Sequence, residues 1–126
     1  MKKKRVLIVE DDQVQIKLFE KIVSQVNVKS ELATTGEQAL DYLKNHNDIG
    51  LVLLDLALPD ISGLDVLESI KKTNNEIPVA ILSATEDPEI ALKAGQLGAE
   101  KFFVKGGGDW KDVMKIFEFI DETINN

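Results

Sequence analysis

The chain contains no cysteine. It can therefore form no disulfide, no thiolate metal site and no cysteine nucleophile. No apolar run approaches the roughly 18 residues that a membrane span requires. The basic start MKKKR leads directly into a short strand-like run instead of a signal peptide. These absences predict a soluble, cytoplasmic protein that does not bind membranes.

Positive charge is also scarce. With 15 basic and 22 acidic residues, the formal net charge is −7, which argues against sequence-independent binding of nucleic acid. Histidine occurs once, as His46 in the polar stretch KNHND, and a solvated helix end explains it better than a phosphohistidine. The 126 residues suit one domain with its own core.

Strand-like and helix-like segments alternate along the whole chain. Apolar, β-branched runs separate segments in which apolar residues recur every three or four positions, as in a helix that buries one face. The pattern predicts strands at about 5–9, 28–33, 51–54, 78–82 and 101–104, and helices at about 13–26, 34–45, 63–73, 88–97 and 109–124. Such regular alternation predicts an α/β fold, a doubly wound parallel sheet with helices on both faces, in three layers.

The stretch LVLLDLALPD, residues 51–60, ends a buried strand on a charge. Its first four residues are all apolar, without the alternation of a strand that has one exposed face, so both faces are predicted to be buried. Asp55 follows at the end of this strand, where an unpartnered carboxylate would be costly. Ligands of α/β folds lie outside the carboxyl ends of the strands, which predicts a functional role for Asp55.

Polar side chains also follow three of the other predicted strands. The residues at these strand ends are Glu10, Asp11, Asp12, Asp55, Ser83 and Lys105. Several carboxylates in one place repel each other unless a cation lies among them, and Mg²⁺ favours carboxylate and phosphoryl oxygens. The set suits phosphoryl transfer onto a carboxylate, with Mg²⁺, the Lys105 ammonium and the Ser83 hydroxyl on the phosphoryl oxygens.

The motifs RVLIVEDD, LVLLDLALPDISG, ILSA and FFVK, in this order, resemble the receiver domain of two-component response regulators. The resemblance covers about residues 4–124. It implies a flavodoxin-like, five-stranded sheet with strand order 2-1-3-4-5. It also implies that residues 1–126 are a single stand-alone receiver domain, similar to the chemotaxis receivers, without an output domain.

Matched position by position, the resemblance makes Asp55 the phosphoacceptor of a phosphorelay. Ser83 and Lys105 match the hydroxyl and the lysine that contact the phosphoryl group, and Phe102 matches the aromatic switch residue. The implied Mg²⁺ ligands are Glu10, Asp11, Asp55 and the backbone carbonyl of Ala57, with Asp12 as a further acidic neighbour.

The same resemblance implies partners and an output. A sensor histidine kinase or a phosphotransfer protein would supply the phosphoryl group. Phosphorylation would draw Ser83 toward the site and shift the face formed by the fourth helix, fifth strand and fifth helix. That face would bind a downstream effector protein. The domain would be a monomer or a phosphorylation-dependent dimer that binds neither nucleic acid nor membrane.

The chain departs from the family pattern in three respects. Gly106 replaces the proline that usually follows the lysine, so a trans peptide bond and a loosely positioned Lys105 are expected. Phe102 lacks the hydroxyl of the usual tyrosine, so it either exchanges apolar contacts in a switch that depends more on Ser83 or simply packs at the edge of the sheet. Ala57 and Thr85 lack the acid or amide groups that orient an attacking water, which predicts slow autodephosphorylation.

Other interpretations fit the sequence less well. A phosphohydrolase with an aspartyl nucleophile would need a second acid two residues on, where the chain has Ala57. A pseudo-receiver, an interaction module that acts without phosphorylation, is favoured only by Gly106. A flavin or nucleotide carrier would need a glycine-rich loop after the first strand. Phe119, off the apolar stripe of the last helix, is either part of a partner-binding patch or a scattered surface residue.

Overall fold

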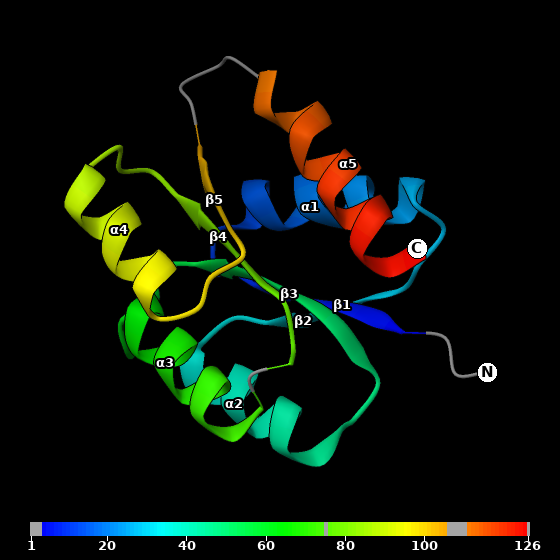
Figure 1. Cartoon of the computed structure of the whole chain (residues 1–126). Helices are drawn as coiled ribbons and strands as arrows, with labels where there is room; N and C mark the ends of the chain where they lie inside the picture. Colours follow the sequence, from blue (N-terminus) through cyan, green and yellow to red (C-terminus); the bar gives the residue numbers. More distant parts are fainter. Residues whose placement is uncertain (1–3, 75, 106–110, 126) are drawn as a thin grey trace.

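A five-stranded parallel sheet forms the centre of the computed structural model, which describes residues 4–74, 76–105 and 111–125. The strands are β1 (Arg5–Val9), β2 (Ser30–Ala33), β3 (Ile49–Asp55), β4 (Val79–Ser83) and β5 (Lys101–Val104). The helices are α1 (Gln13–Gln25), α2 (Gly36–Asn45), α3 (Gly63–Thr73), α4 (Pro88–Gln96) and α5 (Lys111–Asn125). The strand order is β2-β1-β3-β4-β5, and Figure 1 shows α1 and α5 on one face and α2, α3 and α4 on the other. The predicted fold class and strand order are confirmed.

The predicted boundaries differ from the observed ones mainly at strand ends. β2 begins two residues later than predicted, at Ser30, where its pairing with β1 begins. β3 begins earlier, at Ile49, because it already pairs there with Arg5 of β1. β4 begins after Pro78, which has no N–H to donate to the ladder. Residues 109 and 110 of the last predicted helix lie outside the described residues.

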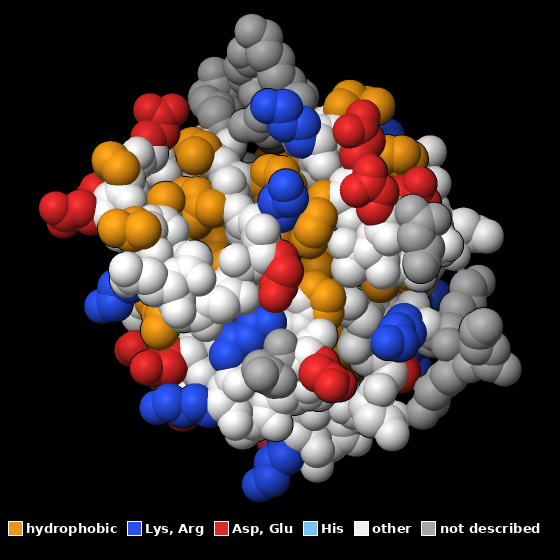
Figure 2. Space-filling model, in the orientation of Figure 1, with side chains coloured by type: hydrophobic (Ala, Val, Ile, Leu, Met, Phe, Trp, Pro, Cys, Tyr) orange, Lys and Arg blue, Asp and Glu red, His pale blue; other side chains and the backbone are white. Residues whose placement is uncertain are grey.

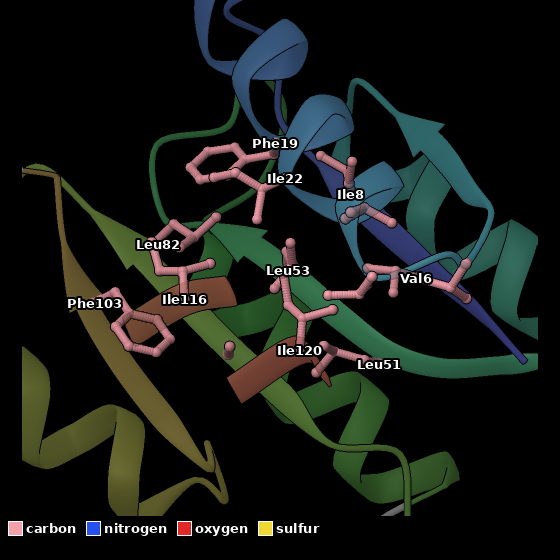
Figure 3. Packing of buried hydrophobic residues seen from close by; sticks show 14 residues of the cluster. Val6, Ile8, Phe19, Ile22, Leu51, Leu53, Leu82, Phe103, Ile116 and Ile120 are labelled. Carbon is pink, nitrogen blue, oxygen red and sulfur yellow. The ribbon is translucent and has the colours of Figure 1, made fainter. Parts of the chain in front are cut away.

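The apolar run in β3 has the double burial that was predicted for it. Leu51 and Leu53 belong to a core formed with α1 and α5, whereas Val52 and Leu54 belong to a core formed with α2, α3 and α4. Figure 3 shows the first of these cores, with Leu51 and Leu53 facing side chains from the helices. Each such side chain stabilises the fold by about 1.5–3 kcal/mol, so the run fixes β3 at the centre of the sheet.

Side-chain caps fix where the loops at the carboxyl edge of the sheet end. Asp12, Thr35, Ser62 and Asp87 are the N-caps of α1 to α4, and each accepts a hydrogen bond from a backbone N–H in the first turn. Pro88 lies in the first turn of α4, as predicted. Each loop that follows β1 to β4 therefore has a defined end.

The opposite edge of the sheet holds His46. It follows the last residue of α2, is exposed, and stacks on Tyr42 with 3.9 Å between ring centroids. Its Nδ1 lies 3.0 Å from the Tyr42 carbonyl oxygen. The predicted solvated helix end is confirmed. Within the described part of the chain, no helix is both long and apolar enough to cross a membrane.

Candidate functional site

The sheet brings polar side chains from four adjacent strands to its carboxyl edge. Glu10 follows β1, Asp55 ends β3, Ser83 ends β4 and Lys105 follows β5. Glu10, Asp55 and Ser83 are also the buried polar or charged side chains among the described residues. Burial of polar groups is costly unless they are paired, so their concentration at one edge indicates a site and not a feature of core packing.

The Lys105 ammonium joins two carboxylates. Its Nζ lies 2.8 Å from Glu10 Oε1 and 3.1 Å from Asp55 Oδ1. The backbone N–H of Lys105 donates to the Ser83 carbonyl oxygen at 2.6 Å. The structure therefore places the Lys105 ammonium on Asp55. How rigidly the side chain is held stays a prediction. The peptide bond between Lys105 and Gly106 lies outside the described residues.

The carboxylates form a compact acidic cluster. Oxygens of Glu10, Asp11 and Asp55 lie within 4.8 Å of one another. The second oxygen of Glu10, Oε2, accepts hydrogen bonds from the backbone N–H groups of Asp11 and Asp12 at 3.2 and 3.3 Å. When the three acids are ionised, their charge exceeds that of the single Lys105 ammonium. A hard divalent cation with oxygen ligands suits this excess.

Burial and charge shift the pKa values of the paired groups. Burial, the largest influence, raises the pKa of Glu10; the hydrogen bond from Lys105 opposes this and the nearby Asp55 adds to it. Burial acts to lower the pKa of Lys105, but the hydrogen bond to Glu10 and the charge of Asp55 outweigh it, so this pKa is raised. Lys105 is therefore a permanent cation at neutral pH.

The Ser83 hydroxyl is linked to the start of α4. Its Oγ accepts a hydrogen bond from the Thr85 N–H at 3.0 Å, and Thr85 Oγ1 accepts one from the Asp87 N–H at 3.1 Å. Asp87 in turn caps α4 by accepting from the Glu89 N–H at 3.0 Å. A movement of Ser83 would break the first of these bonds and release the loop that leads into α4.

The loop after Asp55 passes very close to α3. Asp55 Oδ1 accepts a hydrogen bond from the Ala57 N–H at 3.3 Å, and the Gly63 N–H donates to the Leu56 carbonyl at 3.0 Å. A Cβ on Gly63 would lie 2.5 Å from Leu56 Cα and 2.6 Å from the Asp55 carbonyl oxygen. Only glycine permits this approach, which places the first turn of α3 directly beside Asp55.

This combination of fold and site has a counterpart among known proteins. The family model described as the response regulator receiver domain matches residues 6–116. The chain belongs to the response regulator receiver family. The receiver domain matches that model over nearly its whole described length, including all four strand ends that form the site.

Individual relatives agree with the family model. The Regulator of RpoS from Escherichia coli is 34% identical over 117 residues, which are 93% of this chain and 34% of that protein. The chemotaxis protein CheV2 from Helicobacter pylori is 32% identical, over 97% of this chain and 39% of that protein. The chain thus spans little more than a third of the length of these relatives.

A solved structure has the same architecture. The signal receiver domain of a putative LuxO repressor protein from Vibrio parahaemolyticus superposes with a TM-score of 0.82 at 28% identity. The superposition covers 96% of this chain and 92% of that one. The strand order and the two layers of helices are therefore those of a receiver domain.

The two phenylalanines of β5 face opposite layers of the receiver domain. Phe102 is half-buried and packs against the core of α2, α3 and α4. Phe103 lies in the other core and meets Phe119 edge to face, with ring centroids 6.0 Å apart at 62°. Phe119 lies off the apolar stripe of α5, as expected, but it is only half-exposed, because part of its ring packs on the core beside the edge strand β5. Its place in a partner-binding patch stays a prediction.

The structure brings together most, but not all, of the predicted site residues. Glu10, Asp11, Asp55 and Lys105 converge as expected. Asp12 lies outside the acidic cluster and caps α1, with Oδ2 accepting from a backbone N–H at 3.4 Å. The ion pair between Glu10 and Lys105 was not predicted, because nothing local connects residues that far apart in the sequence.

Proposed function

We propose that this receiver domain accepts a phosphoryl group on Asp55 from a sensor histidine kinase or a phosphotransfer protein. An Asp55 carboxylate oxygen attacks phosphorus, the bond from phosphorus to the donor's imidazole nitrogen breaks, and that nitrogen keeps the bonding electron pair. The observation that carries the proposal is the Lys105 ammonium, 3.1 Å from Asp55 within an acidic cluster at the carboxyl edge of the sheet.

Two side chains would stabilise the transferred group. Lys105 stays charged at neutral pH and would offset the negative charge of one phosphoryl oxygen. The Ser83 hydroxyl accepts a hydrogen bond from the Thr85 N–H, but it retains its own hydrogen to donate to a second oxygen. Neither group acts as a base, so the domain is a phosphoacceptor and not an enzyme that turns over a second substrate.

The acidic cluster would hold Mg²⁺. Carboxylate oxygens within 4.8 Å of one another match the oxygen ligands that this ion takes. We assign the ligands to Glu10, Asp11, Asp55 and the backbone carbonyl of Ala57. When bound, Mg²⁺ supplies positive charge that offsets the carboxylates and the phosphoryl group. Asp12, which caps α1, serves at most as an outer acidic neighbour.

Phosphorylation would change the binding of a downstream effector protein through α4, β5 and α5. Ser83 would move toward the phosphoryl group, and Phe102 on β5 would repack in response. Leu92 on α4 and Met114 on α5 are 64% and 60% exposed, and Figure 2 shows hydrophobic side chains over α4 with acidic ones beside them. We place the effector on this face.

The setting of the domain is part of the same proposal. The net charge of −7 does not favour direct contact with nucleic acid. We propose a cytoplasmic location and a monomer or a phosphorylation-dependent dimer. Gly106 is the one sequence feature that favours a pseudo-receiver, and among the described residues the phosphoacceptor is favoured, since an acid, a hydroxyl and a lysine stand at the matching strand ends.

Incubation with acetyl phosphate and Mg²⁺ tests the proposal directly. Intact-mass measurement should show a gain of one phosphoryl group, and the gain should be lost on chelation of Mg²⁺ or in Asp55→Asn. Asn is isosteric with Asp but is not a nucleophile here. A wild-type chain that stays at its starting mass would overturn the proposal in favour of the pseudo-receiver.

The phosphorylated domain should lose its phosphoryl group slowly. Ala57, two residues beyond Asp55, is exposed at the edge of the site and has no polar side chain to orient an attacking water. After removal of acetyl phosphate, the mass of the phosphorylated form should persist for minutes or longer. A half-life of seconds without a phosphatase would contradict this expectation.

A further inference from the structure

The loop between β3 and α3, residues 56–62, is attached to the start of α2, a helix that it does not join. Both oxygens of the Asp60 carboxylate accept backbone hydrogen bonds from the start of α2. Oδ1 accepts from the Gly36 N–H at 2.8 Å, and Oδ2 accepts from the Glu37 N–H at 2.9 Å. The loop that leaves Asp55 is therefore held by a helix that precedes it in sequence by more than twenty residues.

This attachment is more than ordinary helix capping. The N-cap of α2 is already supplied by Thr35, which accepts from the Gln38 N–H at 3.1 Å. Asp60 takes the two N–H groups of the first turn that Thr35 leaves, and the positive end of the helix dipole favours its charge. These bonds lower the pKa of Asp60, and the hydrogen bond from the Glu37 N–H has the largest effect. The carboxylate is thus ionised, with both oxygens engaged, at neutral pH.

Ile61, next to Asp60, makes a second contact between the loop and the start of α2. A Cβ on Gly36 would lie 2.4 Å from Cγ1 of Ile61, so the loop rests directly on the first residue of α2. Ile61 also packs against the core formed with α2, α3 and α4. The loop is held by a polar and an apolar contact in succession, and both depend on the start of α2.

The loop is held at its other end as well. The Gly63 N–H closes onto the Leu56 carbonyl at 3.0 Å, and the Ala57 N–H donates to Asp55 Oδ1 at 3.3 Å. Ala57 thus has an attachment to the site through its own N–H and an attachment to α2 three residues later, through Asp60. The short segment that carries the Ala57 carbonyl is held at both ends.

We propose that Asp60 is a positioning residue that holds the Ala57 carbonyl in the orientation needed to bind the divalent cation. This rests on the proposed function, in which that carbonyl is a ligand. Groups that orient metal ligands typically change metal affinity by 10- to 100-fold when removed. Asp60 acts through three residues of backbone, so we expect about a 10-fold weakening, at the low end of that range.

The test is a Mg²⁺ titration followed by backbone amide NMR shifts of Ala57 and Asp11, for wild type, Asp60→Ala and Asp60→Asn. Asp60→Ala should raise the half-saturating Mg²⁺ concentration by about 10-fold. Asp60→Asn should have an intermediate effect, because an amide oxygen can keep one of the two hydrogen bonds. Asp65→Asn removes the same charge from the first turn of α3 at an exposed position and should leave the titration unchanged.

A second readout separates positioning from a general loss of stability. With acetyl phosphate, Asp60→Ala should need more Mg²⁺ but approach the wild-type rate once Mg²⁺ is saturating. Wild-type half-saturation in both Asp60 variants would overturn the proposal, as would equal weakening in Asp65→Asn. If wild type binds Mg²⁺ but takes no phosphoryl group, the proposed function fails while the amide titration still decides the role of Asp60.

Discussion

Replacing Lys105 with methionine should slow phosphoryl transfer from acetyl phosphate by about 100- to 1,000-fold, as expected for removal of one preorganised donor from developing negative charge. The ammonium lies 3.1 Å from Asp55 and has no substitute cation among the side chains of the acidic cluster. Methionine keeps a similar length and apolar stem but carries no charge. Intact mass against time, at saturating Mg²⁺, measures the rate.

The same substitution should make folding more sensitive to pH. Without the ammonium, only the long hydrogen bonds from the Asp11 and Asp12 N–H groups oppose the raised pKa of the buried Glu10. When the pKa of a carboxyl group is higher in the folded than in the unfolded protein, the group contributes stability at low pH. The protein loses that contribution as the pH rises through the pKa of the folded state. At about pH 7, Lys105→Met should therefore be about 1–3 kcal/mol less stable than wild type, and nearer to it at about pH 5. Urea unfolding at both pH values measures this, and Mg²⁺ should restore part of the loss.

Lys101→Met provides the matched control. Lys101 is an exposed lysine at the start of the same strand, β5, so its replacement removes equal charge without touching the site. It should leave both the transfer rate and the pH dependence as in wild type. A wild-type rate in Lys105→Met would contradict the role of Lys105, whatever its effect on stability.

Replacing Gly63 with alanine should destabilise the fold by about 1–3 kcal/mol, the usual cost of overpacking. The full cost is expected because the nearest atoms belong to the backbone, which cannot move aside as a flexible side chain can. The added Cβ would meet Leu56 Cα at 2.5 Å and the Asp55 carbonyl oxygen at 2.6 Å. Either α3 or the end of β3 must shift to accept it. The free energy of unfolding in urea gives the loss in stability.

Gly95→Ala is the opposite case on the same fold. Gly95 lies inside α4, and a Cβ there has no neighbour within 4 Å. Alanine should stabilise the protein by about 0.5–1 kcal/mol, because glycine loses more conformational freedom in a helix. Opposite signs for the two substitutions would show that close backbone approach, and not helix propensity, sets the requirement at Gly63. A neutral or stabilising Gly63→Ala would contradict the packing described here.

The sequence by itself determined the architecture and the identity of the strand-end residues. The apolar run in β3 requires burial on both faces, and the regular alternation of strand and helix permits few other arrangements. Parallel strands then bring their carboxyl ends to one edge. This is why the sequence is enough to assign Asp55, Ser83 and Lys105 to one site.

The tertiary structure alone decided which of these groups meet. The Lys105 ammonium lies closer to Glu10 than to Asp55, and Asp12 is turned away to cap α1. Asp60 binds the start of α2, and the half-buried Phe119 packs on Phe103 of β5. Periodicity and caps depend on neighbours a few residues away, which a sequence records directly. Contacts between distant elements depend on how those elements pack, and no local pattern encodes that placement.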